Sequence, residues 1–183
     1  MTPPLTNPLF AGVPKVLWDS FSKHCTFRWK ESLNEKTYPT EYKYQGQNYP
    51  IPYRIGYQSN EGWTAQNETH EAMGLCLQSR HHNGFVREKA LLQLFSYTQY
   101  PFVLAYITRL AGSYVYALYQ HINEARDSFD KDAIQQFCAE NETFLEQTWA
   151  RMTSYWNCYY RATHPDRLKM PNAQFLLWLQ TFQ

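Results

Sequence analysis

The sequence has little that would tie it to a membrane, an oxidising compartment or a zinc site. No apolar run approaches the length needed to cross a membrane, and the opening MTPPLTNPLF has neither the basic region nor the apolar core of a signal peptide. The cysteines form no Cys-x-x-Cys pair and no zinc-finger spacing with histidine: Cys25, Cys76, Cys138 and Cys158. We therefore expect a cytoplasmic protein with buried free thiols and no membrane segment.

Motifs of catalysis and metal binding are missing as well. GxSxG, P-loop and GxGxxG patterns are absent, and His70-Glu71 is followed by Gly74 where an HExxH motif needs its second histidine. His81 and His82 are adjacent in a turn, where their ring nitrogens point apart, so surface or capping roles are favoured over metal binding. We expect no metal and no cofactor. The sequence favours a protein that is not an enzyme, although a catalytic site assembled from dispersed residues stays an alternative. Its pieces would be Cys25, Ser96, His121 and Asp166.

The chain also lacks an excess of positive or negative charge. Seventeen basic residues face sixteen acidic ones, for a net charge of +1. Non-specific nucleic-acid binding usually draws on a strong basic excess, so nucleic acid is an unlikely partner. It stays an alternative because helical scaffolds with arginine and aromatic side chains can hold a strand.

Aromatic residues, in contrast, are abundant. They make up 17% of the chain within a hydrophobic share of 44%, a composition typical of a packed domain. We predict one mainly α-helical domain over 1–183, with about six helices and a short N-terminal β-hairpin. Its parts are an extended arm at 1–14, the hairpin at 41–58 and a helical core at 64–183.

Tyrosines alternate along the predicted hairpin on both sides of the turn at 45–48. The inward set of the second strand is Tyr49, Ile51, Tyr53 and Ile55. Pro50 and Pro52 fall on the opposite face, which predicts an edge strand because proline cannot donate a ladder hydrogen bond.

Helical periodicity begins near Thr64. A first helix ends at a turn in which Gly84 is a left-handed cap, and a second covers 85–97. Pro101 opens a long third helix to Ile122, within which Gly112 allows a close crossing. The pattern over 130–163 fits one helix or two joined at Asn141, and a short apolar helix near the C-terminus should dock on the rest.

The segment Asn83-Gly84-Phe85-Val86-Arg87-Glu88-Lys89-Ala90-Leu91 resembles HEAT-type helical repeats, with a degenerate second copy near Leu110-Ala111-Gly112 and Val115. The resemblance covers 71–122 and implies a right-handed α-α scaffold that presents a surface to a partner. It also implies that Arg87 is structural and that Val86, Ala90 and Leu91 are core.

Aromatic residues crowd two turns of the helix that carries Arg151 and Arg161. One stripe, made of Trp149, Met152, Trp156 and Tyr159, is predicted to be core. Tyr155 and Tyr160 fall on either side of it, where an aromatic rim with arginines is typical of a protein-binding hot spot. The hairpin supplies a second candidate set at an unpaired strand edge: Tyr42, Tyr44 and Tyr57.

From these features we expect a non-enzymatic scaffold that binds another protein. An inhibitor or immunity-type role, in which the protein occludes a toxin or enzyme, suits a small single-domain binder, and a homo-oligomer is possible.

Overall fold

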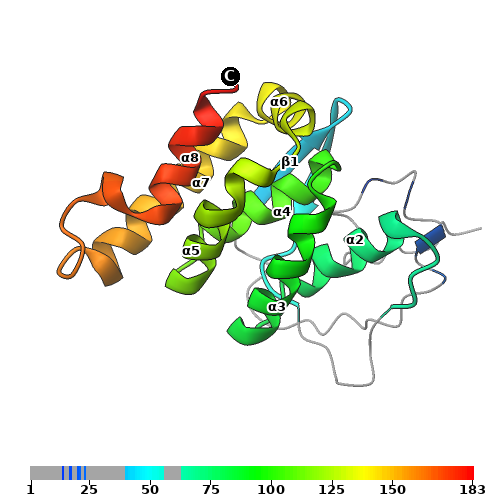
Figure 1. Ribbon diagram of the computed structural model, residues 1–183, viewed down its shortest axis with the longest axis horizontal. Helices are drawn as coiled ribbons and strands as arrows, with labels where there is room; N and C mark the ends of the chain where they lie inside the picture. The colour runs from blue at the N-terminus through cyan, green and yellow to red at the C-terminus, as the bar shows by residue number, and fades with distance from the viewer. Residues whose placement is uncertain (1–13, 15–16, 18–19, 22, 24–39, 56–62) are drawn as a thin grey trace, which may run out of the picture.

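The computed structural model describes residues 14, 17, 20, 21, 23, 40–55 and 63–183 (Figure 1). Most of the predicted arm at 1–14 lies outside these residues. The described part is mainly helical, with one two-stranded antiparallel hairpin, as predicted. Its strands are β1 (Thr40–Tyr44) and β2 (Gln47–Ile51). Its seven α-helices are α2 (Glu68–Gln78), α3 (Gly84–Leu94), α4 (Pro101–Ala111), α5 (Tyr116–Ala125), α6 (Lys131–Glu140), α7 (Glu142–Tyr155) and α8 (Pro171–Gln180).

Helix α4 lies in the middle and contacts β1 and all six other described helices (Figure 1). Pro101 is its first residue, where the missing N–H costs no intrahelical bond. Every residue from Phe102 to Ala111 is buried. A helix that is apolar on almost all sides needs cover on all sides, and the surrounding helices supply it.

Helices α2 and α3 pack against each other across the turn at 79–83. Asn83 caps α3 by accepting a hydrogen bond from the Phe85 N–H at 2.9 Å, so Gly84 is the first helical residue and not a left-handed cap. Arg87 is buried and donates to the carbonyls of His81 and His82, both at 2.9 Å. Its role here is therefore structural, although a HEAT-type repeat stays a prediction.

The predicted long helix from Pro101 to Ile122 is wrong, because the chain breaks after Ala111 into α4 and α5. The predicted close crossing at Gly112 is confirmed. A Cβ placed there would meet the Thr148 methyl group of α7 at 3.0 Å. A side chain at this position would press on α7, so the lack of a side chain at Gly112 allows the close contact.

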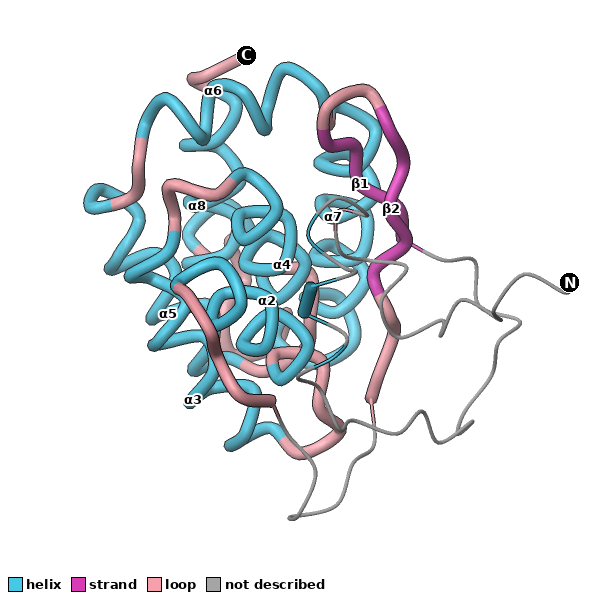
Figure 2. Tube along the Cα trace, turned by 90° about the vertical axis from the view of Figure 1, so that its right-hand side faces the viewer, coloured by secondary structure: helices cyan, strands magenta, loops and turns pink. Residues whose placement is uncertain are grey.

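Residues 130–163 form two helices joined at Asn141, and that residue also holds the hairpin. Its side-chain oxygen accepts from the Lys43 N–H at 2.7 Å, and its amide nitrogen donates to the carbonyls of Lys43 and Phe137, both at 2.9 Å. Asn141 is 3% exposed. Figure 2 shows the resulting arrangement, with the hairpin lying along the edge of the helices.

The hairpin is shorter than the predicted 41–58. Gln45 and Gly46 both have positive φ, at 50° and 74°, which suits a tight two-residue turn between twisted strands. Tyr42 pairs with Tyr49, and β2 ends at Ile51. Beyond β2 the expected alternation of inward and outward side chains reverses: Pro52 is buried and Tyr53 is exposed. Ile55 then hydrogen-bonds the turn after α2, through the Arg80 carbonyl at 2.9 Å.

Helix α8 is the predicted C-terminal helix. It docks against α5 and α7 and buries Phe175, Leu176 and Leu179. Side chains of the hairpin and of every described helix join one hydrophobic core.

Candidate functional site

The hairpin tyrosines proposed as a partner-binding edge lie largely inside. Tyr42 is 1% exposed, with its ring 5.7 Å from that of Tyr49 and 6.4 Å from that of Tyr106. Its assignment to a binding surface is wrong, because its own side chain is buried against Tyr106 of α4. Tyr44 is half-buried against Phe102, and Tyr57 lies outside the described residues.

The tyrosines predicted on the last turns of α7 meet at Tyr114, in the break between α4 and α5. The Tyr155 and Tyr114 rings lie 5.9 Å apart, and the Tyr160 hydroxyl donates to the Tyr114 carbonyl at 2.5 Å. Arg161 is exposed elsewhere on the turn, where it donates to Asn157 at 3.2 Å. Three of the four predicted residues thus converge, since Arg151 lies beside Tyr155.

Four arginines from separate elements gather here, and we call them the arginine cluster: Arg54 after β2, Arg80 after α2, Arg109 in the last turn of α4, and Arg151 in α7. Arg80 is fully buried and Arg109 is 6% exposed. Arg80 donates to the carbonyls of Pro52 and Tyr53, at 2.9 and 2.6 Å, which fixes the segment carrying Arg54 against the end of α2.

The charge of the arginine cluster is not balanced by carboxylates in the described part of the chain. None of the ion pairs found there includes one of its members. Burial, then the neighbouring Arg151 and Arg54, lower the pKa of Arg109 to about 9, so its guanidinium is still positive at neutral pH. Burial followed by Arg109 and Arg54 lowers the pKa of Arg80 far below its usual value. Buried charges that repel one another cost folding free energy unless an anion joins them.

Hydrogen-bonding capacity is also unused inside the cluster. Buried nitrogen atoms on three of its four guanidinium groups have no hydrogen-bond partner: Arg80 Nη1, Arg109 Nε and Arg151 Nη1. Buried polar atoms are nearly always paired in proteins, so we interpret these three unpaired donors as candidates for binding an acceptor.

Tyrosines surround the cluster, and we call Tyr53, Tyr114, Tyr155 and Tyr159 the tyrosine rim. Tyr53, Tyr114 and Tyr159 are 45%, 46% and 64% exposed. Tyr155 lies between them, with its ring 6.1 Å from that of Tyr159. Burial, and then Tyr53, raise the pKa of Tyr155, which keeps its hydroxyl protonated and able to donate. The site thus has buried cations below and aromatic side chains at the surface.

Sequence reasoning missed most of this site. Tyr159 was assigned to the core stripe, but α7 continues into a π-helical turn over Trp156–Tyr160, which changes the helical phase and turns Tyr159 outward. Arg109 did offer a signal. It is the one charged residue in the apolar segment PFVLAYITRLA, where a charge has an unusually high desolvation cost.

Other chemical groups remain apart. His121 pairs with Glu88 at 2.9 Å, Asp166 caps the Leu168 N–H, and Ser96 is exposed in a 3-10 turn. No hydrogen bond joins these three members of the hypothetical dispersed catalytic site, and Cys25 lies outside the described residues. Within those residues, no three His, Cys, Asp or Glu side chains gather as a metal site.

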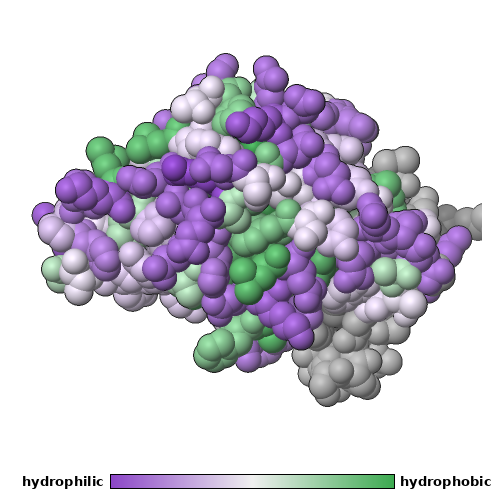
Figure 3. Space-filling view, in the orientation of Figure 1, coloured by the Kyte–Doolittle hydropathy of each residue, from purple (hydrophilic) through white to green (hydrophobic). Residues whose placement is uncertain are grey.

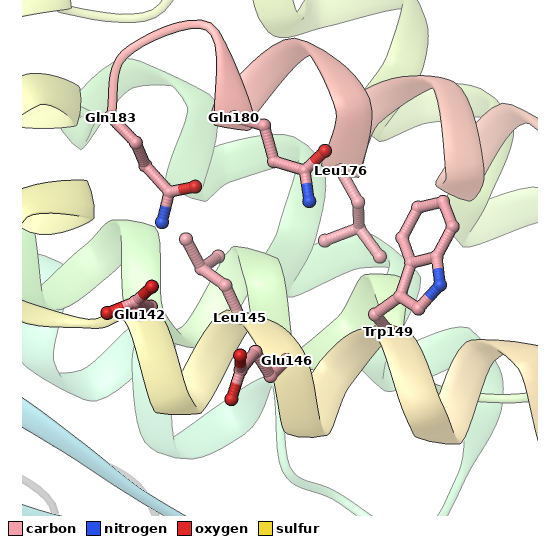
Figure 4. A pocket seen from close by; sticks show the side chains of 7 residues that line it. All are labelled: Glu142, Leu145, Glu146, Trp149, Leu176, Gln180 and Gln183. Atoms are coloured by element: carbon pink, nitrogen blue, oxygen red, sulfur yellow. The ribbon is translucent and has the colours of Figure 1, made fainter.

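A shallow pocket of about 380 Å³ lies between α7 and the C-terminal end (Figure 4). It is lined by Glu142, Leu145, Glu146, Trp149, Leu176, Gln180 and Gln183. Both carboxylates are exposed, and Glu142 lies in the first turn of α7, where the helix dipole favours an acid. We interpret this pocket as a solvated surface groove.

The molecular face in Figure 3 is mostly hydrophilic, with hydrophobic residues in small separate groups. No broad apolar patch stands out among the described residues on that face, so it offers no competing site. No described helix has the length and apolar character needed to cross a membrane. Comparison with family models, curated proteins and solved structures found no match for the chain.

Proposed function

We propose that the chain is a non-enzymatic binding protein that recognises an acidic segment of another protein on the arginine cluster and tyrosine rim. One observation carries this proposal: four arginines without a carboxylate partner among the described residues lie beneath exposed tyrosines. Arginine and tyrosine are the residues most enriched in binding hot spots, where buried anchors supply most of the affinity.

Charge complementarity supports an acidic partner. An acidic side chain entering the site would satisfy the unpaired guanidinium nitrogens and relieve the mutual repulsion of the arginines. The tyrosines around it offer apolar area and hydroxyl groups to the flanking residues of the same segment. A nucleic-acid strand fits less well, because its phosphates need basic groups spread along a surface and the chain has a net charge of only +1.

The finer parts of the proposal are occlusion of the partner, in the manner of an inhibitor or immunity protein, and a cytoplasmic setting. The position of the arginine cluster supports the first. Its members lie after β2, after α2, in the last turn of α4 and in α7, so a partner segment bound there would be held by several packed elements and not by one loop.

Panning a random peptide library against the full chain tests the proposal. We expect the enriched peptides to carry Asp or Glu at one shared position. Their binding should be lost on Arg151→Gln and kept on Arg161→Gln, a change of the same type at an exposed arginine outside the cluster. Enrichment of neutral or basic peptides, or equal binding to both variants, would contradict the proposal.

A further inference from the structure

The arginine cluster has more positive charge than one carboxylate can balance. Four guanidinium groups approach one another, and a fifth, Arg87, lies next to Arg54 and Arg80. Arg87 donates to two carbonyl groups through Nη1, at 2.9 Å each, and its buried Nε has no hydrogen-bond partner. None of the five arginines has a carboxylate partner in the described part of the molecule.

The donors in the cluster match an anion with several acceptor oxygens. A carboxylate has two oxygens and one charge, whereas a phosphate monoester has three terminal oxygens and a charge near −2 at neutral pH. The unpaired donors come from three different arginines, on the turn after α2, on α4 and on α7. Donors on three separate elements are not confined to one plane, which suits a tetrahedral group better than a planar one.

The burial of these donors separates them from ordinary surface arginines. Arg80 is 0% and Arg109 is 6% exposed, so neither can reach bulk water to satisfy its remaining nitrogen. Both side chains are fixed in place. Arg109 is part of the packed helix α4, and Arg80 is held by its hydrogen bonds to the carbonyls of Pro52 and Tyr53. Rigid, dry donors bind an anion without the loss of side-chain freedom that an exposed arginine suffers.

From this arrangement we infer that the arginine cluster is a binding site for the dianion of a phosphate monoester, held by Arg80, Arg109 and Arg151, with its carrier leaving between Tyr53, Tyr114 and Tyr159. This inference rests on the proposed function in one respect: the carrier would be a phosphorylated side chain of the partner segment. A free phosphorylated small molecule would use the same chemistry, and the experiment below separates the two sources.

Calorimetric titration of the full chain at constant ionic strength in a chloride buffer tests the site. The ligands are inorganic phosphate, acetate, a short phosphotyrosine peptide and the same peptide with Glu in place of phosphotyrosine. We expect phosphate to bind more tightly than acetate. Arg109→Met and Arg151→Gln should weaken phosphate binding about ten- to a hundredfold each, the range for one charged hydrogen bond. Arg161→Gln should bind like the unchanged protein.

The outcomes distinguish a failure of the phosphate site from a failure of the proposed binding of a partner protein. A phosphopeptide that binds more tightly than phosphate identifies a protein source, and phosphate that binds more tightly than the peptide identifies a small molecule; both support the site. Binding of phosphate without any peptide from the library supports the site and contradicts the proposed function. If the Glu peptide binds as tightly as the phosphopeptide, or if the cluster variants bind phosphate as well as Arg161→Gln does, the inference is overturned. Circular dichroism of each variant shows that it is folded.

Discussion

Arg151 of α7 is a charged neighbour of the buried Arg109 of α4, and neither arginine has a carboxylate partner among the described residues. A packed core normally excludes such a pair. Its presence between two otherwise apolar helix faces is the main reason for placing a binding site here. The stability of the surrounding scaffold is what allows the pair to persist, and the first predictions concern that scaffold.

Replacing Asn141 with alanine should loosen the hairpin from the helices. The change removes the hydrogen bonds from Asn141 to both backbone groups of Lys43, which are part-buried. We expect a loss of about 1–3 kcal/mol in the free energy of unfolding, measured by urea denaturation. Asn48→Ala, at an exposed position of the same hairpin, is the control. An equal effect of the two substitutions would show that Asn141 does not hold the hairpin.

Gly112→Ala should destabilise the protein because the new methyl group would press on Thr148 of α7. Overpacking of this kind costs about 1–3 kcal/mol. Thr148→Ser removes the opposing methyl group and keeps the hydroxyl, which donates to Phe144 at 2.9 Å. The double variant should therefore recover part of the loss in thermal denaturation. No recovery would contradict the assignment of the loss to the contact between Gly112 and Thr148.

Alkaline pH should unfold the chain through its buried tyrosines. Burial is the first cause that raises the pKa of Tyr42, Tyr106 and Tyr119 above the ordinary value. A raised pKa in the folded state contributes stability that is complete below about pH 10 and is lost as the pH rises further, since the unfolded tyrosines ionise first. The free energy of unfolding, measured by urea denaturation, should therefore be lower above pH 10 than at pH 8.

Tyr119→Phe should make that fall shallower, because one titrating group is removed. Tyr159→Phe, at a side chain that is 64% exposed, is the matched control and should leave the slope unchanged. Absorbance of tyrosinate at 295 nm gives the second readout. If all tyrosines ionise before the helical signal is lost, the buried tyrosines do not resist ionisation and the prediction is wrong.

The sequence carried enough local information for most elements but not for the site. Pro101 marked the start of α4, and the Gln45-Gly46 turn marked the hairpin, because each depends on a few neighbouring residues. The break after Ala111 lies where Gly112 approaches Thr148 of α7. Such a contact between residues far apart in the chain leaves no trace in helical periodicity.

The arginine cluster was invisible for the same reason. Arg54, Arg80, Arg109 and Arg151 are spread over almost 100 residues, and each except Arg109, which stands in an apolar segment, resembles a solvated charge. The aromatic residues around Arg151 and Tyr155 do predict these two members of the candidate site. Tyr159 was assigned to the wrong face because the π-helical turn that exposes it departs from the 3.6-residue period on which the assignment depended.

The thermal stability of Arg109→Met in an anion-free buffer tests most directly whether the cluster is built for binding. Methionine keeps much of the side-chain volume and removes a buried charge that repels Arg151 and Arg54. If the cluster awaits an anion, the variant should melt higher than the unchanged protein, by about 2–4 °C for each kcal/mol gained. Arg161→Met should not change the melting temperature. A clear fall in the melting temperature of Arg109→Met would show that Arg109 stabilises the fold and would contradict the account.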